Sequence, residues 1–255
     1  MMTVKLNHRI DGKGPHVLLL HAVGVDLTFL DAVAAKLAGD FTVLRADLRG
    51  HGKSPYAPAA GLEDYADDVH ALLGELNFAP CAVAGFAFGG MVTQALAVKY
   101  PQDVRALVIS SCTSAQTPES AKAVAARGAD AKRDGIASLL DVTMQRWLND
   151  DFRLRGGDTA TRARLLSTDV RGWADAWHAM ASIDTAPRLR EIKVPTLCLV
   201  GEFDKSTPPP IMKAIGDRIP GSRYIVMPGG PHMLFIEQPE ETARVVGGFL
   251  KDVLP

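Results

Sequence analysis

The sequence is poor in cysteine, and the few cysteines present exclude two classes of site. Cys81, Cys112 and Cys198 form an odd-numbered set without metal-ligand spacing, which argues against a disulfide framework and against a thiolate metal site. Cys81 and Cys198 lie inside apolar, strand-like runs, and Cys112 ends another. We therefore expect buried thiols in a protein of a reducing compartment.

An excess of one charge and long apolar runs are also missing. The net charge is -1 at pH 7, and no basic stripe is present to neutralise phosphates, so we expect no nucleic-acid partner. The first apolar run, residues 17–20, is far too short to cross a membrane, and no lysine- or arginine-led signal precedes it. We expect a soluble, cytoplasmic protein that acts on a small-molecule substrate. The sequence leaves open whether the chain forms a homo-oligomer.

Cofactor motifs are absent as well. The chain has no cluster of metal-ligating residues and no phosphate-binding glycine loop. Its most glycine-rich turn, residues 85–90, lacks the Gly-x-Gly opening that a dinucleotide-binding turn needs. We predict neither a cofactor nor a metal ion.

What the sequence does have is a regular alternation of short β-rich runs with amphipathic helical stretches. This rhythm predicts an α/β fold in which helices flank a mostly parallel sheet, and 255 residues suffice for one large domain. The expected strands are residues 4–10, 16–21, 41–46, 80–86, 104–110, 194–201 and 222–227. The expected helices are residues 26–37, 62–76, 88–99, 209–218 and 239–253.

The rhythm changes between residues 113 and 190. This segment has no clear strand, is rich in arginine and alanine, and predicts several helices that break at Gly135, at Gly156-Gly157 and at Gly172. A helical insertion between two strands would lie over the carboxyl edge of the sheet, where open α/β folds bind ligands. We expect a small helical cap at residues 113–190, with residues 1–112 and 191–255 forming the core.

A sharp strand-to-helix turn is predicted at residues 85–90. The run Gly85-Phe86-Ala87-Phe88-Gly89-Gly90 places glycines two residues on either side of Ala87, which lets strand and helix approach closely. In a nucleophile elbow the central residue is a serine, displayed at a helix N-terminus. Alanine has no lone pair with which to attack a carbonyl and no proton for a base to remove.

An acid and a base follow in the chain order that this type of triad requires. Asp204 follows an apolar strand and is our candidate for the orienting carboxylate, with Glu202 as its rival. His232 follows the next strand and precedes the C-terminal helix, where a catalytic base would reach over the sheet edge. Asp204 would hold the ring of His232 in the required tautomer and stabilise its protonated form.

Two backbone N–H groups are candidates for an oxyanion hole. In this architecture one donor belongs to the residue after the nucleophile, here Phe88, and the other to the loop after an earlier strand. That loop is His21-Ala22-Val23-Gly24, and we assign the second donor to Val23. Backbone donors need no particular side chain, so they remain when the nucleophile is lost.

With these residues in place, the chain resembles the α/β-hydrolase superfamily over nearly its whole length. Within it, the first hundred residues are most similar to the 3-oxoadipate enol-lactonase group. The resemblance rests on residues 21–24, 47–54, 85–90, 201–204 and 230–232. It implies an α/β-hydrolase fold, and it implies a serine where this chain has Ala87.

We therefore expect a serine hydrolase of lactones or esters in which alanine has replaced the nucleophile. Such a protein binds an acyl substrate but hydrolyses it poorly or not at all. Either an engineered substitution made to trap a substrate or a natural loss of hydrolysis would account for Ala87. Engineering is favoured, because Asp204, His232 and both oxyanion loops are intact.

Other functions stay open at this point. The His232–Asp204 pair could serve as a base without a nucleophile, as in a cofactor-free lyase or oxygenase. The closing residues 232–239 also resemble C–C bond hydrolases, and a non-catalytic protein that binds a small ligand is a third class. We expect the cap to set specificity, with Trp147, Trp173 and Trp177 as candidate substrate-binding residues. If the substrate carries a carboxylate, a cap arginine such as Arg146 or Arg171 could pair with it.

Overall fold

The computed structural model describes residues 3–254 and contains one seven-stranded sheet. The strand order is β1-β3-β2-β4-β5-β6-β7, and every neighbouring pair is parallel except β1 with β3. The strands are β1 (His8–Asp11), β2 (His16–Leu20), β3 (Thr42–Ala46), β4 (Cys81–Phe86), β5 (Val104–Ser110), β6 (Thr196–Gly201) and β7 (Arg223–Met227). The predicted α/β fold with a mostly parallel sheet is confirmed.

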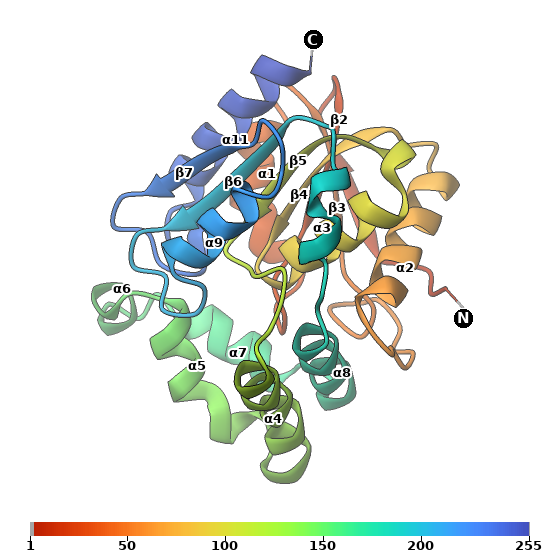
Figure 1. The fold of residues 1–255 in the computed structure, drawn as a ribbon. Coiled ribbons are helices and arrows are strands. Elements are labelled where there is room, and N and C mark those ends of the chain that lie inside the picture. The colour runs from red at the N-terminus through yellow and green to blue at the C-terminus, as the bar shows by residue number, and fades with distance from the viewer. Residues whose placement is uncertain (1–2, 255) are drawn as a thin grey trace.

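Helices cover both faces of this sheet (Figure 1). From β2 the chain moves to β3 on one side, whereas each later connection moves toward β7 on the other side. Because all these crossovers are right-handed, the helix between β2 and β3 lies on one face of the sheet and the helices of the later crossovers lie on the other face. Accordingly α1 (Asp31–Leu37) packs against α11 (Pro239–Val253) on one face, and α2 (Leu62–Glu75) packs against α3 (Phe88–Lys99) on the other. The short helix α9 (Pro209–Gly216) joins β6 to β7. Strands β4 and β6 are buried along their full length because both of their faces are covered.

The reversal of strand order beside β2 determines where a site can form. The chain leaves β2 toward β3 and returns to β4 on the other side of β2, which creates a crevice between the loops that follow β2 and β4. Val23 lies in the loop after β2, and Ala87 directly follows the last residue of β4. Two segments 64 residues apart thus meet at the carboxyl edge of the sheet.

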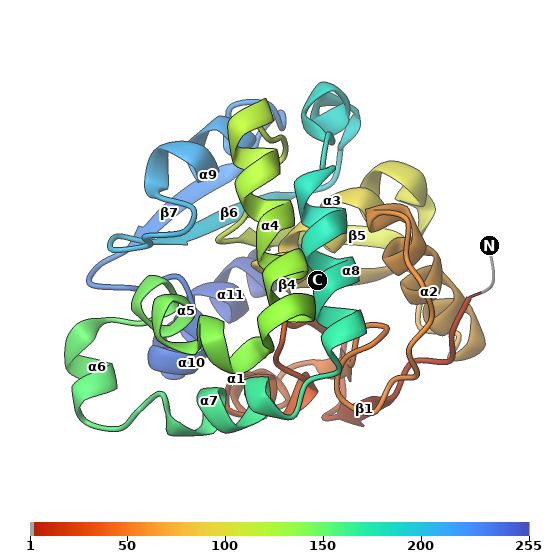
Figure 2. The same ribbon diagram turned by 90° about the horizontal axis from the view of Figure 1, so that it is seen from below.

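All the regular elements between β5 and β6 are helices, and this segment lies apart from the sheet (Figure 1). Helices α4 and α8 lie side by side over the carboxyl edge (Figure 2). A single bridge between Ala115 and Asp184 ties the base of this insertion together. The five α-helices are α4 (Pro118–Asp134), α5 (Leu140–Trp147), α6 (Asp150–Leu154), α7 (Thr159–Leu166) and α8 (Val170–Ala181); we call them the cap.

Two sequence expectations about the elements are wrong. The first strand was expected at residues 4–10 but spans only His8–Asp11, because the backbone N–H groups of Val4 and Asn7 bond to the side chains of Asp68 and Ser54 instead of to a strand. Gly172 does not break a helix but lies in the first turn of α8. The glycine there meets a packing need, since a Cβ at Gly172 would overlap the carbonyl oxygen of Gly50.

Among residues 3–254, no helix is both long enough and apolar enough to cross a membrane.

Candidate active site

The turn between β4 and α3 holds Ala87 in a strained backbone conformation. Its φ is 51° and its ψ is -111°, values that an L-residue adopts only when the surroundings impose them. The surroundings do so through two glycines: a Cβ at Gly85 would overlap the carbonyl oxygen of Gly89, and a Cβ at Gly89 would lie 2.7 Å from the carbonyl oxygen of His21. The Ala87 N–H donates to the carbonyl of Ser110 at 2.8 Å. The turn therefore has the strained strand-to-helix geometry that the glycines of residues 85–90 predict, with a methyl group at its centre.

The structure brings Asp204 and His232 into contact. Nδ1 of His232 lies 3.0 Å from Oδ1 and 2.9 Å from Oδ2 of Asp204, and both side chains are buried. Asp204 also accepts hydrogen bonds from the N–H groups of Ser206 and Thr207 and from the Thr207 hydroxyl, at 2.8–2.9 Å. These contacts fix the carboxylate, which in turn fixes the imidazole with Nδ1 as the donor and Nε2 available as a base.

The environment of Asp204 keeps it ionised. Burial on its own would raise the pKa of this carboxyl, but the positive charge of His232, its hydrogen bond, and the N–H groups of Thr207 and Ser206 outweigh burial. The pKa of Asp204 therefore lies below its ordinary value. The rival acid, Glu202, has a different partner: its Oε2 accepts from the N–H of Gly229 at 2.8 Å.

The two residues predicted to supply the oxyanion donors lie at one cavity. Val23 and Phe88 both line the cavity that contains Ala87 and His232. Within the described part of the chain, neither the Val23 N–H nor the Phe88 N–H has a hydrogen-bond acceptor. Phe88 is also the first residue of α3, so its N–H adds to the positive end of the helix dipole. The arrangement suits an oxygen that carries developing negative charge.

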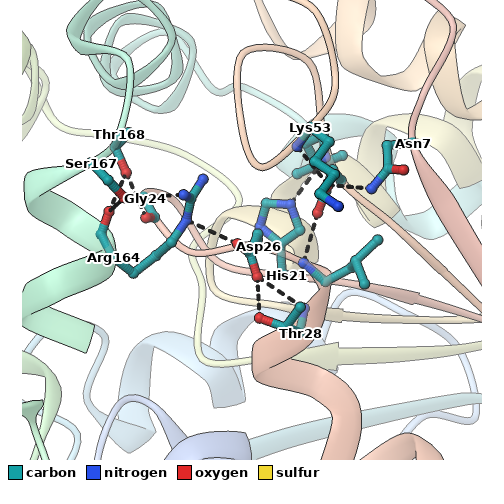
Figure 3. Close-up of polar contacts among 12 residues, drawn as sticks. Asn7, His21, Gly24, Asp26, Thr28, Lys53, Arg164, Ser167 and Thr168 are labelled. Carbon is teal, nitrogen blue, oxygen red and sulfur yellow. Dashed lines mark hydrogen bonds and ion pairs between the residues drawn. The ribbon is translucent and has the colours of Figure 1, made fainter. Parts of the chain in front are cut away.

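The loop of residues 21–26, which carries Val23, is bonded to the cap on one side and to the core on the other (Figure 3). On the cap side, Nε of Arg164 lies 2.9 Å from Oδ2 of Asp26, and the Thr168 hydroxyl donates to the carbonyl of Gly24 at 2.9 Å. On the core side, His21 bonds the carbonyl of Ala22 through Nδ1 and accepts the Leu48 N–H at Nε2. The cap therefore fixes the loop as well as covering the site.

A second buried histidine, His51, lies near the first, with its ring tilted by 53° to that of His21. The two imidazole rings are 5.4 Å apart, and Nδ1 of His51 bonds the carbonyl of Arg49 at 3.0 Å. Burial, followed by the charge of His21, lowers the pKa of His51 to about 3, and burial also lowers the pKa of His21. Both rings are therefore neutral at physiological pH.

The cavity above Ala87 has a volume of about 530 Å³ and is roofed by the cap. Trp147, Trp177 and Met180 line it. Two of the three tryptophans that we predicted to bind substrate therefore lie at the cavity. Trp173 does not line it but packs behind them, with its ring 6.4 Å from that of Trp147 and 5.5 Å from that of Trp177. Its position three residues into α8 turns it toward the core, where it is 1% exposed.

The structure separates the two arginines that the sequence left as alternatives. Arg146 lines the cavity, whereas Arg171 is exposed and pairs with Asp169 outside it. Arg127 also lines the cavity and was missed in the sequence analysis. A periodic signal could have found it, since Ser120, Val124 and Arg127 lie at helical spacing on the face of α4 that meets the cavity.

In the part of the chain that the structure describes, no group of three or more histidine, cysteine, aspartate or glutamate side chains is placed to hold a metal ion. All three cysteines are unpaired and buried, and burial raises the pKa of each thiol. None of them is a thiolate nucleophile at neutral pH.

Comparison with known proteins supports the fold. The chain is 27% identical over 252 residues to 3-oxoadipate enol-lactonase 1 of Acinetobacter baylyi. The alignment covers 97% of this chain and 94% of that protein. Among solved structures, a thermophilic esterase from Thermogutta terrifontis with malate bound has a TM-score of 0.93 at 29% identity, covering 99% of this chain and 95% of the esterase. The enol-lactonase from Burkholderia xenovorans has a TM-score of 0.90 at 28% identity, with 97% of each chain covered. A model of the alpha/beta hydrolase family matches residues 17–245, so the chain belongs to that family and lies close to its enol-lactonases.

Proposed function

We propose that this chain is built to act on a lactone or ester, and that with alanine at position 87 it holds such a substrate without completing hydrolysis. One observation carries the proposal. His232, which Asp204 holds, lines one cavity together with Val23, Phe88 and Ala87. These are the groups that a serine hydrolase uses, apart from the hydroxyl.

The chemistry follows from the roles of these groups once a serine stands at position 87. Nε2 of His232 takes the proton of the hydroxyl as the oxygen attacks the substrate carbonyl, and the N–H groups of Val23 and Phe88 stabilise the resulting oxyanion. The histidinium then gives its proton to the leaving oxygen, leaving an acyl-enzyme. His232 next activates a water molecule, which releases the acid and restores the serine. Asp204 stays ionised throughout and stabilises the histidinium.

The relatives support this substrate class without fixing the substrate. Their names include 3-oxoadipate enol-lactonases of Acinetobacter baylyi and a pimeloyl-[acyl-carrier protein] methyl ester esterase of Aeromonas hydrophila. These proteins act on a lactone and on an ester respectively. The shared chemistry is attack on an acyl carbon.

The test is the substitution Ala87→Ser, compared with the unchanged chain on p-nitrophenyl acetate and then on a panel of small lactones. We expect turnover to rise by on the order of a million-fold, the scale seen when a protease loses its serine. Equal inertness or equal activity of the two proteins would overturn the proposal. A gain on some lactones only would narrow the substrate.

A second candidate is a base-only catalyst. His232 has Asp204 on Nδ1 and an Nε2 that faces a cavity without a nucleophile, an arrangement that could remove a proton from an acidic C–H or O–H group. Turnover by the unchanged chain that disappears in His232→Ala would favour this candidate. Tight binding with no turnover, both in the unchanged chain and in Ala87→Ser, would instead favour a ligand-binding protein.

A further inference from the structure

The cap is also bonded to the loop that carries His232. The contact lies at the turn between α5 and α6, residues 147–150, which we call the cap corner. Trp147 ends α5 there and lines the cavity, and Asn149 directly precedes α6. On the other side lies the loop between β7 and the short helix α10 (Leu234–Glu237), which we call the base loop. Segments 80 residues apart in the sequence therefore meet beside the candidate base.

Asn149 makes three hydrogen bonds across this contact. Its Nδ2 donates to the carbonyl of Gly229 at 2.8 Å and to Oε1 of Glu237 at 2.8 Å. Its backbone N–H donates to Oε2 of Glu237 at 3.0 Å. An asparagine that precedes a helix usually turns its side chain back to that helix, but the side chain of Asn149 makes no capping bond to α6. The side chain serves the base loop instead of its own helix.

Glu237 uses its whole carboxylate on this contact. Both oxygens accept from Asn149, and among residues 3–254 they have no other hydrogen-bond partner. The side chain is half-buried, so its oxygens have lost part of their water and depend on these donors. Removing the donors would leave a partly desolvated carboxylate unpaired, which costs more than the bonds themselves contribute.

Bonds to the cap corner lie on both sides of His232. Three residues before it, the carbonyl of Gly229 accepts from Asn149. One residue after it, the N–H of Met233 donates to the carbonyl of Trp147 at 3.0 Å. Within residues 3–254, no hydrogen bond joins the backbone of His232 itself to another residue. The position of the imidazole therefore depends on the bonds that flank it.

Asp204 is held differently. Its carboxylate accepts from three donors of its own loop at 2.8–2.9 Å. That loop gives the base loop one bond, from the N–H of Phe203 to the carbonyl of Gly230 at 2.8 Å. Its contact with the cap corner is an exposed pair, in which Nζ of Lys205 lies 3.4 Å from Oδ1 of Asp150. Loss of the Asn149 bonds should therefore displace the base and leave the acid in place.

We propose that Asn149 and Glu237 are positioning residues, which hold His232 against Asp204 by joining the base loop to the cap corner. Trp147 belongs to the same corner and lines the cavity, so the wall that meets a ligand and the base that acts on it are fixed together. The alignment of the base can be measured in the unchanged chain. Only its effect on turnover rests on the proposed function.

The first readout is kinetic, in the Ala87→Ser background with p-nitrophenyl acetate. Asn149→Ala removes both side-chain bonds, and we expect kcat to fall about ten- to a hundredfold with a smaller change in KM, because a displaced base weakens the transition state more than the bound substrate. The controls are Asp151→Ala and Glu240→Gln, which alter exposed neighbours of the two residues and should leave both constants as they were.

A paired exchange separates this contact from a general loss of packing. Asn149→Asp sets two carboxylates against each other and should lower kcat at least as far as Asn149→Ala. Adding Glu237→Gln to that variant restores a donor and an acceptor between the two side chains, and we expect it to recover part of the loss. Recovery stays partial, because an aspartate cannot donate to the carbonyl of Gly229.

The second readout needs no hydrolysis. In the unchanged chain, the proton on Nδ1 of His232 lies in the bond to Asp204 and should give a downfield NMR signal that exchanges slowly with water. Loss of the signal in His232→Gln identifies it. We expect exchange to become about tenfold faster in Asn149→Ala, the change that follows when local stability falls by about one hydrogen bond. The double variant should slow it again in part.

Unchanged exchange of the His232 signal in Asn149→Ala would overturn the proposal, whatever happens to kcat. Equal losses in Asn149→Asp with and without Glu237→Gln would overturn it too. Thermal unfolding shows whether each variant is folded, and if Asn149→Ala is not, Glu237→Gln alone tests the same contact with a side chain of the same size. If Ala87→Ser hydrolyses nothing while exchange still responds to Asn149, the proposed function falls and the positioning role stands.

Discussion

Arg164 of the cap lies 2.9 Å from Asp26 of the core, and this ion pair joins α7 to the loop that carries Val23. Both side chains are mostly buried, at 20% and 15% exposure, so solvent screens the pair less than it screens the exposed ion pairs of the surface. The cap is thus connected to the position of a backbone N–H that would stabilise an oxyanion.

Arg164→Ala in the Ala87→Ser background tests this connection. We expect kcat to fall about ten- to a hundredfold while KM changes less, because a displaced oxyanion donor weakens the transition state more than the bound substrate. Steady-state kinetics on p-nitrophenyl acetate measure the split. Arg171→Ala removes a cap arginine whose partner, Asp169, is remote from the loop, and it serves as the control. An unchanged kcat in Arg164→Ala would show that the loop holds its position without the cap.

The acid of the pair can be tested against its neighbour. In the Ala87→Ser background, Asp204→Asn should lower kcat by about ten-thousandfold, because the amide favours the wrong tautomer of His232 and cannot stabilise its charge. Glu202→Gln leaves the His232 contact intact and should have little effect, since Glu202 bonds the Gly229 N–H instead. Equal losses in the two variants would contradict the assignment of Asp204.

Two glycines provide a matched test of packing between cap and core. A Cβ at Gly172 would overlap the carbonyl oxygen of Gly50, so Gly172→Ala should destabilise the fold by about 1–3 kcal/mol. Gly248, in the exposed part of α11, has nothing within 4 Å of its ideal Cβ, so Gly248→Ala should stabilise the fold by about 0.5–1 kcal/mol. Urea unfolding of both variants measures the two changes. The same sign for both would contradict the packing argument.

Buried His51 predicts sensitivity to mild acid. Its pKa is about 3 in the folded protein and near 6.5 in an unfolded chain, so the unfolded state binds a proton first. The free energy of unfolding is therefore full above pH 6.5 and falls as the pH drops from 6.5 toward 3. Between pH 7.5 and pH 5 we expect His51 to account for about 2 kcal/mol of the loss.

His51→Asn isolates this contribution, because the amide can still donate to the Arg49 carbonyl but does not titrate. Urea unfolding at pH 7.5 and at pH 5 should show a smaller difference between the two pH values in this variant than in the unchanged chain. Exposed His178 offers a control, since His178→Asn should leave the difference as it was. Identical pH dependence in all three proteins would show that His51 is not buried as a neutral ring.

Much of this architecture could be predicted from the sequence because it is encoded locally. The elbow is one example, since residues 85–90 carry the glycines that impose the turn wherever the strand and helix meet. The boundaries of α3 and α11 are another, and both were predicted to the residue. The order of Asp204 and His232 behind successive strands was also enough to predict which side chains the sheet edge brings together.

Other features depend on contacts that no local pattern records. Trp173 and Trp177 share a face of α8, yet only Trp177 reaches the cavity, because Trp173 is turned toward Leu165 and Gly24. Val4 and Asn7 fit a strand by composition, but distant side chains capture their N–H groups. Arg127 differs from the paired cap arginines only in what surrounds it after folding. Each of these depends on which segments the fold places next to one another.

In this turn, the backbone conformation of residue 87 does not depend on which small side chain stands there. The backbone of residue 87 is imposed by Gly85 and Gly89, and the methyl group found there does nothing to maintain it. A serine at position 87 would therefore fit the scaffold without rearrangement. Alanine and serine codons differ by one base, so a single nucleotide change could place a hydroxyl at position 87 without disturbing the fold.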